Sequence, residues 1–508
     1  MGQRIIITKA PEQRRMSGDA TSGTLGRRAL HGLVLMLAQN VVSRASTLLS
    51  QLVLAALLLP ADFGVISLTY TVTVVASTLM NVGIDEVLLQ RQSAMRLWIG
   101  PAFWITLSLA LVAGLMVALV APVAAAMYQA PELVGLLAVL ALAMPLQALA
   151  SVPAMIMRAR LQFGVVAVYG SLEIVAQALL TVGLAWGGFG AYSFVVPVPI
   201  LAVVRAIVWW RLAAANTRLR PQRRRWKYVI GNTAITAATR TLINVISQGD
   251  YFVLGLLATQ DAVGVYYFGF RLAGQPLWVL ASNFSGVLFP ALVQLKSDPA
   301  RQGVAALKAA TLLSFCVMPL ALLQAAVAGP LVGSFFGQKW AASIPIIQLL
   351  SVGLALDAVS WIAGSLLSAR GEFMATLRFL LVQAPVFFVL VAIGAALDQA
   401  IGVACAVCLY YAVTQPLFVF AVYRRVGVTA RQVAGIYLWP TGCAAAAVGA
   451  GLALSKLPAF ATHPLMRAAI ICAVAGPAYA ALVRWLAPDV WRELSGRISS
   501  GFQRRMAA

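Results

Sequence analysis

Charged residues are scarce in this chain of 508 residues: Asp, Glu, Lys and Arg together make up 10% of it. A typical soluble domain is about a quarter charged. Hydrophobic residues supply 61% of the sequence, and apolar runs of the length that spans a bilayer, about 20 residues, recur along most of it. This composition excludes a soluble globular protein and predicts an all-α polytopic membrane protein. A transmembrane β-barrel would instead show alternating runs of about ten residues.

Acidic residues and potential metal ligands are also few. The 15 acidic residues against 37 basic ones give a net charge of +22, but the basic residues are scattered in short loops, so we expect no nucleic-acid partner. Cys405 and Cys408 form a CxxC, but it lies in an apolar run with no second pair and no nearby His, and neither His has a metal partner at ligand spacing. The predicted outer loops hold no Ser/His/Asp set or carboxylate pair. We therefore expect no metal site, no cofactor and no enzymatic activity.

The apolar runs predict fourteen membrane spans. Their approximate ranges are 30–58, 63–84, 98–121, 133–156, 163–186, 191–210, 229–257, 263–290, 305–328, 341–368, 374–396, 400–422, 432–454 and 465–483. With the N-terminus inside, thirty of the 37 Lys and Arg residues fall in inside segments, three in outside segments and four within spans. Cytoplasmic loops carry this excess of basic residues, so we expect a multi-pass protein with both termini in the cytoplasm.

The longest inside loop follows six spans and divides the chain into two halves. Residues 1–28 are polar and basic, without the apolar core or cleavage site of a signal peptide, and are predicted to be a disordered cytoplasmic tail. The predicted parts that follow are an N-terminal bundle of spans 1–6 (29–210), a basic cytoplasmic linker (211–228), a C-terminal bundle of spans 7–12 (229–423), two peripheral spans (424–486) and a cytoplasmic tail (487–508).

The halves contain a weak internal repeat at an offset of 200 residues. The segment VLAALLLPADFGV (Val53–Val65) aligns with VLGLLATQDAVGV (Val253–Val265), with five matches in thirteen positions, Gly64 and Gly264 among them. Spans 1 and 7 run in the same direction, so the halves are predicted to be parallel repeats related by an axis along the membrane normal. This architecture is found in transporters, whose substrate site lies between the halves.

Spans 1 and 7 each carry an Arg and an Asn four residues apart, in swapped order: Asn40 with Arg44, and Arg240 with Asn244. At 100° per residue the polar side chains of each span form one narrow stripe. The stripe of span 1 contains Asn40, Arg44, Thr47 and Gln51, and that of span 7 contains Thr233, Thr236, Arg240, Asn244 and Ser247. Such a stripe faces protein or water, and an Arg at mid-span costs roughly 2.5–3.5 kcal/mol on insertion scales. The stripes are therefore either hydrogen-bonded helix contacts or the walls of a cationic cavity. We favour the cavity for the arginines.

At this point the sequence resembles a known family. The basic segment entering span 1, the turn LLLPADFGVISL with Pro60–Gly64, the following GIDEVLLQRQ with Gly83–Arg91, and fourteen spans are similar to the Wzx-type polysaccharide transporters of the MOP flippase superfamily. The resemblance implies two six-helix bundles, spans 1–6 and 7–12, around a cationic central cavity, with spans 13 and 14 peripheral. It also implies a location in the bacterial cytoplasmic (inner) membrane.

The resemblance further implies a substrate, an undecaprenyl-diphosphate-linked oligosaccharide, which is moved from the cytoplasmic to the outer leaflet by alternating access. Because arginine pairs with phosphate oxygens through a fork of N–H groups, we expect Arg44, Arg240 and Arg271 to bind the diphosphate, with Asn40 and Asn244 beside them. The lipid bilayer is the other expected partner, and a polysaccharide polymerase and a chain-length regulator are further candidates.

Coupling to H⁺ or Na⁺ requires a titratable or ion-binding group. Glu173, Asp250 and Asp357 lie within predicted spans, and each is either a coupling residue or half of an internal ion pair with an arginine. Arg205 lies near the inner end of span 6 and is expected to reach the interface. Asp62, in the outer turn, either caps span 2 or helps to close an outer gate.

Four alternatives stay open, one of which, a non-transporting scaffold of envelope assembly, would not explain the duplicated Arg/Asn stripe. A multidrug exporter of the same superfamily takes cationic substrates, which argues against a site lined by arginine. A peptidoglycan-precursor (lipid II) flippase also has fourteen spans and cavity arginines, and the PADFGV turn favours the polysaccharide branch over it. A membrane polysaccharide polymerase or ligase generally has a large outer loop, whereas the longest outer segments here have about a dozen residues.

Overall fold

The computed structural model describes residues 39–40, 42–80, 95–160, 162–213, 239–457 and 463–493. Within these ranges every regular element is a helix, and eleven helices are long and apolar enough to cross a membrane. The prediction of an all-α polytopic membrane protein is confirmed. The segment Gly83–Arg91, the predicted N-terminal tail, most of the basic linker and residues 494–508 of the predicted C-terminal tail lie outside the described residues.

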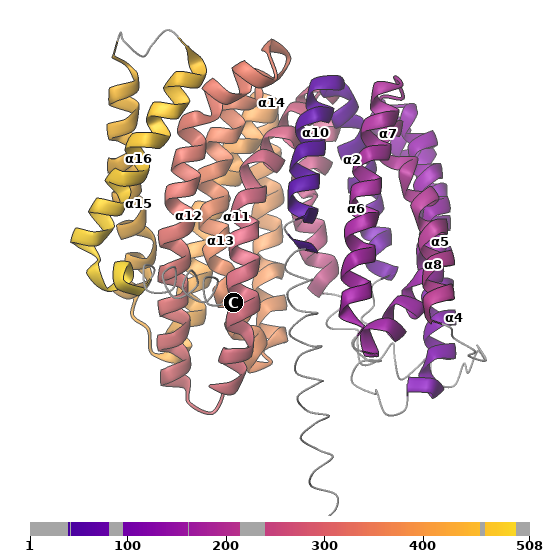
Figure 1. The fold of residues 1–508 in the computed structure, drawn as a ribbon, viewed down its shortest axis with the longest axis horizontal. Coiled ribbons are helices and arrows are strands. Elements are labelled where there is room, and N and C mark those ends of the chain that lie inside the picture. Colours follow the sequence, from indigo (N-terminus) through magenta and orange to yellow (C-terminus); the bar gives the residue numbers. More distant parts are fainter. Residues whose placement is uncertain are drawn as a thin grey trace, which may run out of the picture. The chain divides into compact units, whose positions relative to one another are not determined.

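The described helices follow the predicted spans closely (Figure 1). After a first apolar helix, Val42–Leu57, the first half continues with α2 (Pro60–Met80), α4 (Met95–Met127), α5 (Glu132–Ala159), α6 (Phe163–Trp186), α7 (Tyr192–Val195) and α8 (Pro197–Ala213). The second half contains helix 239–247, α10 (Gly249–Leu257), α11 (Gln260–Gln294), α12 (Pro299–Phe335), η4 (Gln338–Trp340), α13 (Ser343–Arg370), α14 (Phe373–Tyr423), η5 (Arg424–Val426), α15 (Ala430–Ser455) and α16 (Pro464–Leu486).

The helix α14 accounts for two predicted spans. Its 51 residues would extend about 76 Å if straight, more than twice the hydrocarbon thickness of a bilayer. The backbone leaves helical geometry at Asp398 and Gln399, where Gln399 has φ +36°. A Cβ on Gly394 would lie 2.3 Å from the carbonyl oxygen of Gly402, so the two halves of α14 return along each other. This break coincides with the predicted gap between the spans 374–396 and 400–422.

The chain divides into two compact units that are not continuous in sequence. Unit 1 contains Met1–Leu54, Ile84–Leu111 and Leu142–Trp226, and unit 2 contains Ala55–Gly83, Val112–Ala141 and Lys227–Ala508. Unit 2 thus combines nearly all of predicted span 2 and one end each of predicted spans 1, 3 and 4 with the whole second half. The predicted division into consecutive bundles is a different partition and stays a prediction.

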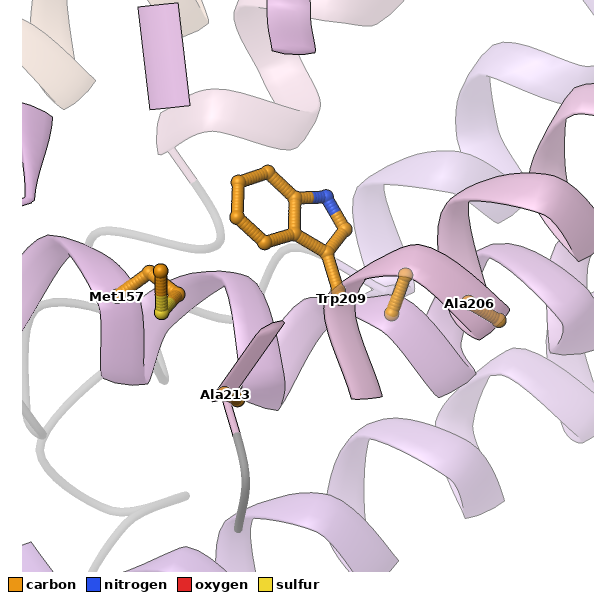
Figure 2. Packing of buried hydrophobic residues seen from close by; sticks show 5 residues of the cluster. Met157, Ala206, Trp209 and Ala213 are labelled. Carbon is orange, nitrogen blue, oxygen red and sulfur yellow. The ribbon is translucent and has the colours of Figure 1, made fainter. Parts of the chain in front are cut away.

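The core of unit 1 forms where α5 meets α8. Figure 2 shows Trp209 with Met157, Ala206 and Ala213 in this buried cluster. The neighbouring Trp210 donates its indole N–H to the carbonyl of Leu149 at 3.0 Å. The alanines let these helices approach closely, and the two indoles fill the space that remains.

In unit 2, α11, α12 and α13 pack against one another, and α13 also packs against α14 (Figure 1). The last helices, α15 and α16, pair with each other and lie on α12, where Val327 contacts Ala468 and Ile471. In addition, the Tyr479 hydroxyl donates to the carbonyl of Phe315 at 2.8 Å. Small and β-branched side chains therefore attach the C-terminal pair to one helix of the second half.

Candidate functional site

Unit 2 has a turn end and a basic end. The turn end is formed by Ala55–Gly64, Gln260–Gly264 and η4. The basic end is formed by the junction of α13 with α14, at Arg370–Glu372, together with η5. The helix α13 runs from the turn end, just after Trp340, to the basic end at Arg370.

At the turn end, the helix α2 begins at Pro60, so the segment Pro60–Gly64 is the first turn of a helix and not the connecting turn that the sequence predicted. Proline suits this position because the first helical N–H has no partner within the helix. Asp62 accepts a hydrogen bond from the backbone N–H of Leu59 at 2.9 Å. This is the back-bonding half of a capping box, so Asp62 caps the start of α2.

The two repeats cross at the turn end through their matched glycines. A Cβ on Gly64 would lie 2.0 Å from the carbonyl oxygen of Gln260, and a Cβ on Gly264 would lie 1.8 Å from that of Pro60. Residues 60 and 260, like 64 and 264, are equivalent in the repeat at offset 200. The contact is therefore reciprocal, and it depends on the absence of a side chain at both glycines.

The short segment between α12 and α13 covers the end of the first helix. Lys339 Nζ donates to the carbonyls of Ala56 and Leu58 at 2.8 and 3.0 Å, and Trp340 Nε1 donates to that of Ala55 at 2.8 Å. Trp340 is fully buried, with its ring centroid 5.2 Å from that of Phe63. These donors satisfy carbonyls that a helix C-terminus leaves without partners.

Sequence reasoning counted Lys339 only as one of three outside basic residues and did not single out Trp340. The signal available was weak: a lysine beside a tryptophan in a short segment where basic residues are rare. Burial lowers the pKa of the Lys339 ammonium, and the charge of Asp62 opposes that shift. The turn end is thus held together by backbone contact, aromatic packing and an ammonium group.

Farther along the same helices, the polar stripe of span 7 contacts α2. Asn244 Nδ2 donates to Thr78 Oγ1 at 2.8 Å, and Thr71 Oγ1 donates to Gln248 Oε1 at 3.4 Å. For Asn244 this is the helix contact that the sequence left open as one reading of the stripe. Arg240, one turn earlier, is exposed. Its expected role in substrate binding, like that of Asn244, stays a prediction.

Arg271 of α11 is positioned by the tyrosine one turn before it. Its Nη1 donates to the hydroxyl of Tyr267 at 2.5 Å, and the guanidinium carbon lies 5.4 Å from the centroid of the same ring. The side chain is half-buried, and no carboxylate pairs with it among the described residues. A guanidinium has five N–H donors, so Arg271 keeps donors available for an anion.

Asp250 lies at the start of α10 and is 1% exposed. Its Oδ2 accepts from the hydroxyl of Tyr266 at 2.7 Å and its Oδ1 from the backbone N–H of Tyr251 at 2.9 Å. The ring of Tyr251 packs between those of Tyr266 and Tyr267, with centroids at 5.5 and 5.7 Å. Within the described ranges, the carboxyl group is thus held by the Tyr266 hydroxyl and the Tyr251 backbone and by no arginine.

Sequence reasoning found Asp250 and Arg271 but missed Tyr266 and Tyr267. These tyrosines open the run YYFGF, which ends directly before Arg271, and Tyr267 is four residues from it. A helical i, i+4 pair of tyrosine and arginine was therefore readable. The bond from Tyr266 to Asp250 depends on how α10 packs against α11, which the sequence does not give.

The other two carboxylates differ from each other. Asp357 of α13 is half-buried and accepts from Trp361 Nε1 at 3.3 Å, one turn away. In unit 1, Glu173 of α6 pairs with Arg205 of α8, at 3.3 Å between Oε1 and Nη1, with side chains 20% and 30% exposed. For Glu173, the internal ion pair that the sequence left open is present.

The remaining predicted residues lie on the first helix of unit 1. Asn40 and Arg44 are both exposed there, and Thr47, on the same stripe, is half-buried. Gln51, the last member of the stripe, is buried. The stripe therefore passes from an exposed to a buried environment as the helix approaches the turn end, and the predicted role of Asn40 and Arg44 stays a prediction.

Comparison with known proteins identifies the family. Residues 53–345, more than half of the chain, match a family described as polysaccharide biosynthesis protein. The chain is 26% identical to the succinoglycan biosynthesis transport protein ExoT of Rhizobium meliloti over 309 residues, 59% of this chain and 61% of that protein. It is 23% identical to the lipopolysaccharide biosynthesis protein WzxC of Escherichia coli over 365 residues, 70% of this chain and 73% of that protein.

The fold is shared with solved transporters. The chain is similar to the lipid II flippase MurJ in an inward closed conformation, with a TM-score of 0.71 at 13% identity, covering 89% of this chain and 99% of that one. It is also similar to a multidrug resistance MATE family transporter of the MOP superfamily, with a TM-score of 0.59 at 15% identity, covering 78% and 98% of the two chains. The chain spans about three-fifths of the length of ExoT. It belongs to the polysaccharide biosynthesis protein family, as its resemblance to the Wzx-type transporters predicts.

Proposed function

We propose that this protein is a transporter that moves an undecaprenyl-diphosphate-linked oligosaccharide from the cytoplasmic to the outer leaflet by alternating access, and that it is not an enzyme. The observation that carries this proposal is the reciprocal crossing of α2 and α11 at Gly64 and Gly264. This crossing brings the two repeats into backbone contact at one end. Alternating access requires such a contact in one of its states. The family match and the names of ExoT and WzxC support the substrate class.

The proposed orientation follows from the distribution of basic residues. The turn end faces the outside of the bacterial inner membrane, and both termini are cytoplasmic. In this orientation the crossing at Gly64 and Gly264 lies on the outer side. The substrate would then load from the cytoplasmic side, and a polymerase and a chain-length regulator would act on it after release.

The proposed binding chemistry uses arginine against diphosphate. Arg271, oriented by Tyr267, presents its remaining N–H groups, while Arg44 and Arg240 are exposed on their helices. A guanidinium binds two phosphate oxygens at once, and charge-assisted bonds of this kind are about twice as strong as neutral ones. Asn40 and Asn244 would add neutral donors. The lipid tail stays in the bilayer.

For coupling to H⁺ or Na⁺, Asp250 is the strongest of the three predicted carboxylates. Glu173 already has Arg205 as its cation, which leaves it less free to exchange a proton or bind a second cation. Asp250 is fully buried and pairs with no arginine among the described residues, and its tyrosine partner can donate to the charged form and release it when the carboxyl is protonated. Asp357 is the second candidate because the hydrogen bond that it accepts from Trp361 is long, at 3.3 Å.

The proposal is tested with purified protein in liposomes, by following movement of a fluorescent undecaprenyl-diphosphate-linked glycan between leaflets. We expect Arg271→Ala to lower the rate at least about tenfold, the loss of one charge-assisted contact being worth roughly 1.5–3 kcal/mol. Arg301→Ala, at an exposed site on α12, is the matched control and should transport normally. Asp250→Asn should abolish acceleration by an imposed proton or sodium gradient while leaving slow exchange.

Equal rates for Arg271→Ala and the wild type would contradict the phosphate site. Transport of a lipid II analogue in preference to an oligosaccharide repeat unit would favour the peptidoglycan-precursor alternative, whose fold this chain shares. Transport of a cationic drug in place of either lipid would favour the multidrug alternative.

A further inference from the structure

A groove of about 530 Å³ lies at the basic end of unit 2, away from every residue proposed for transport. It is formed by the beginning of α14 and by η5, which follows the end of the same helix. Its lining residues are Glu372, Met374, Ala375, Arg378, Phe379, Val382 and Arg425. Charged groups therefore share one small concavity with apolar side chains.

The charges in and beside the groove do not balance. Arg425 Nη1 pairs with Glu372 Oε2, and Arg370 Nε donates to Glu372 Oε1 at 2.7 Å, so one carboxylate is shared by two guanidinium groups. Arg378, one turn into α14, is exposed and has no hydrogen-bond or ion-pair partner among the described residues. Three arginines against one glutamate leave a net charge of about +2, and the groove favours an anion.

The apolar side of the groove continues along α14. Beyond Val382, which is 69% exposed, the outward face carries Val386, Val389 and Ile393 at 44%, 58% and 53% exposure. Steps of four, three and four residues place these side chains on one face of the helix, in line with Arg378. The face from residue 378 to 393 is about 22 Å long, comparable to the depth of one bilayer leaflet with its headgroups.

We propose that this groove binds an anionic phospholipid, with the headgroup phosphate at Arg378 and Arg425 and an acyl chain along Val382, Val386, Val389 and Ile393. Basic pockets between helices at the cytoplasmic membrane surface suit such headgroups. The hydrogen-bonding side chains that line the groove are Glu372, Arg378 and Arg425, and both carboxylate oxygens of Glu372 are engaged by arginines. The groove therefore offers guanidinium groups to a phosphate and apolar surface to an acyl chain.

The site is tested by thermal unfolding of the detergent-purified protein with added phosphatidylglycerol or phosphatidylcholine. A ligand that binds only the folded state raises the unfolding midpoint, and we expect a rise of about 3 °C with phosphatidylglycerol and under 1 °C with phosphatidylcholine. Arg378→Gln should lose at least half of the rise. It is the variant of choice because Arg378 has no partner among the described residues that the change would leave unsatisfied. Arg431→Gln, an exposed arginine at the same end, is the control and should keep the full rise.

Two further measurements test whether a free phosphate is enough for binding and whether the apolar face contributes to it. Glycerol phosphate without acyl chains should give no rise, and Val382→Asn should weaken the response to phosphatidylglycerol. An unchanged response in Arg378→Gln, a full rise with glycerol phosphate, or an equal rise with phosphatidylcholine would overturn the proposal. Arg271→Ala should keep the lipid response while losing transport, so failure of this site and failure of the proposed function give different results.

Discussion

The two copies of the repeat agree at the turn end and differ farther along their helices. Both copies place a glycine against the backbone of the other at the same position. In the first copy the helix Val42–Leu57 is continuous and carries an exposed Arg44, whereas in the second a break at Gln248 precedes the buried Asp250. The glycine contact is the same in both copies at the turn end. The polar residues of the two copies differ farther along the helices, where substrate binding and coupling are proposed.

The copies also start their second helices differently. In the first copy Asp62 reaches back to the N–H of Leu59, and in the second Thr259 accepts from the N–H of Ala262 at 3.3 Å. Either hydrogen bond satisfies one backbone N–H at a helix start, so the capping residue can differ between the two copies. The glycine cannot vary in the same way, because the atom in its path belongs to the backbone of the other copy.

The largest effect is expected from breaking the shared crossing. Gly64→Ala and Gly264→Ala each place a methyl group about 2 Å from a carbonyl oxygen, and we expect each to lower the free energy of unfolding by about 3 kcal/mol. Because the contact is reciprocal, the two losses should be similar, as measured by thermal unfolding in detergent.

Gly286→Ala is the control for the glycine substitutions, since it lies in the same helix α11 with open space around it. It should be neutral or stabilise by up to about 1 kcal/mol through helix propensity. A loss in Gly286→Ala as large as in Gly264→Ala, or a loss at only one crossing glycine, would contradict the reciprocal contact.

A smaller effect should follow from removing a donor that serves the first copy only. Trp340→Phe keeps an aromatic ring beside Phe63 but leaves the carbonyl of Ala55 without its donor, which should cost about 2 kcal/mol. In a cysteine-free background, Ser67→Cys, buried one turn from the crossing, should become more reactive toward a thiol reagent in this variant. Trp361→Phe, which alters a long and exposed bond, should change neither measurement.

The smallest effect concerns the acidic groups of the two halves. The first half holds Glu173 against Arg205 within its spans, and the second places Glu372 between Arg370 and Arg425 at a helix junction. Hydrogen bonds from Arg370 and then Arg425 lower the pKa of Glu372 from its usual 4.5, while burial opposes them. The interaction of Glu372 with the two arginines therefore stabilises the fold above about pH 4.5. This contribution is lost as the pH falls through the lowered pKa of Glu372.

Glu372→Gln should remove less than about 1 kcal/mol at neutral pH, because the three side chains are partly exposed. Its unfolding midpoint should also fall less steeply than that of the wild type between pH 5 and pH 3. A wild type and a variant with the same dependence on pH would show that Glu372 makes no such contribution.

The sequence predicted the helical class, most span boundaries and the break inside α14, because apolar length and basic loops report these features directly. It also identified Gly64 and Gly264 as equivalent. It did not show why both positions are glycine, which is the close contact of each with the backbone of the other copy. It could not predict that Lys339 and Trp340 cap a helix about 280 residues earlier, nor that Tyr266 reaches Asp250. Those contacts depend on how helices that are separate in the sequence pack together, and no local sequence pattern encodes that packing.

The crossing at the turn end has the geometry of an isologous interface within a single chain. Residue 60 meets residue 264 while residue 64 meets residue 260, as happens when two identical subunits associate about a two-fold axis. In a homodimer of one half, any substitution would appear twice, once in each subunit. Joined in one chain, one copy can hold Pro60 and Arg44 while the other holds Gln260 and Asp250, so the pair keeps its symmetric contact and carries an asymmetric set of charges.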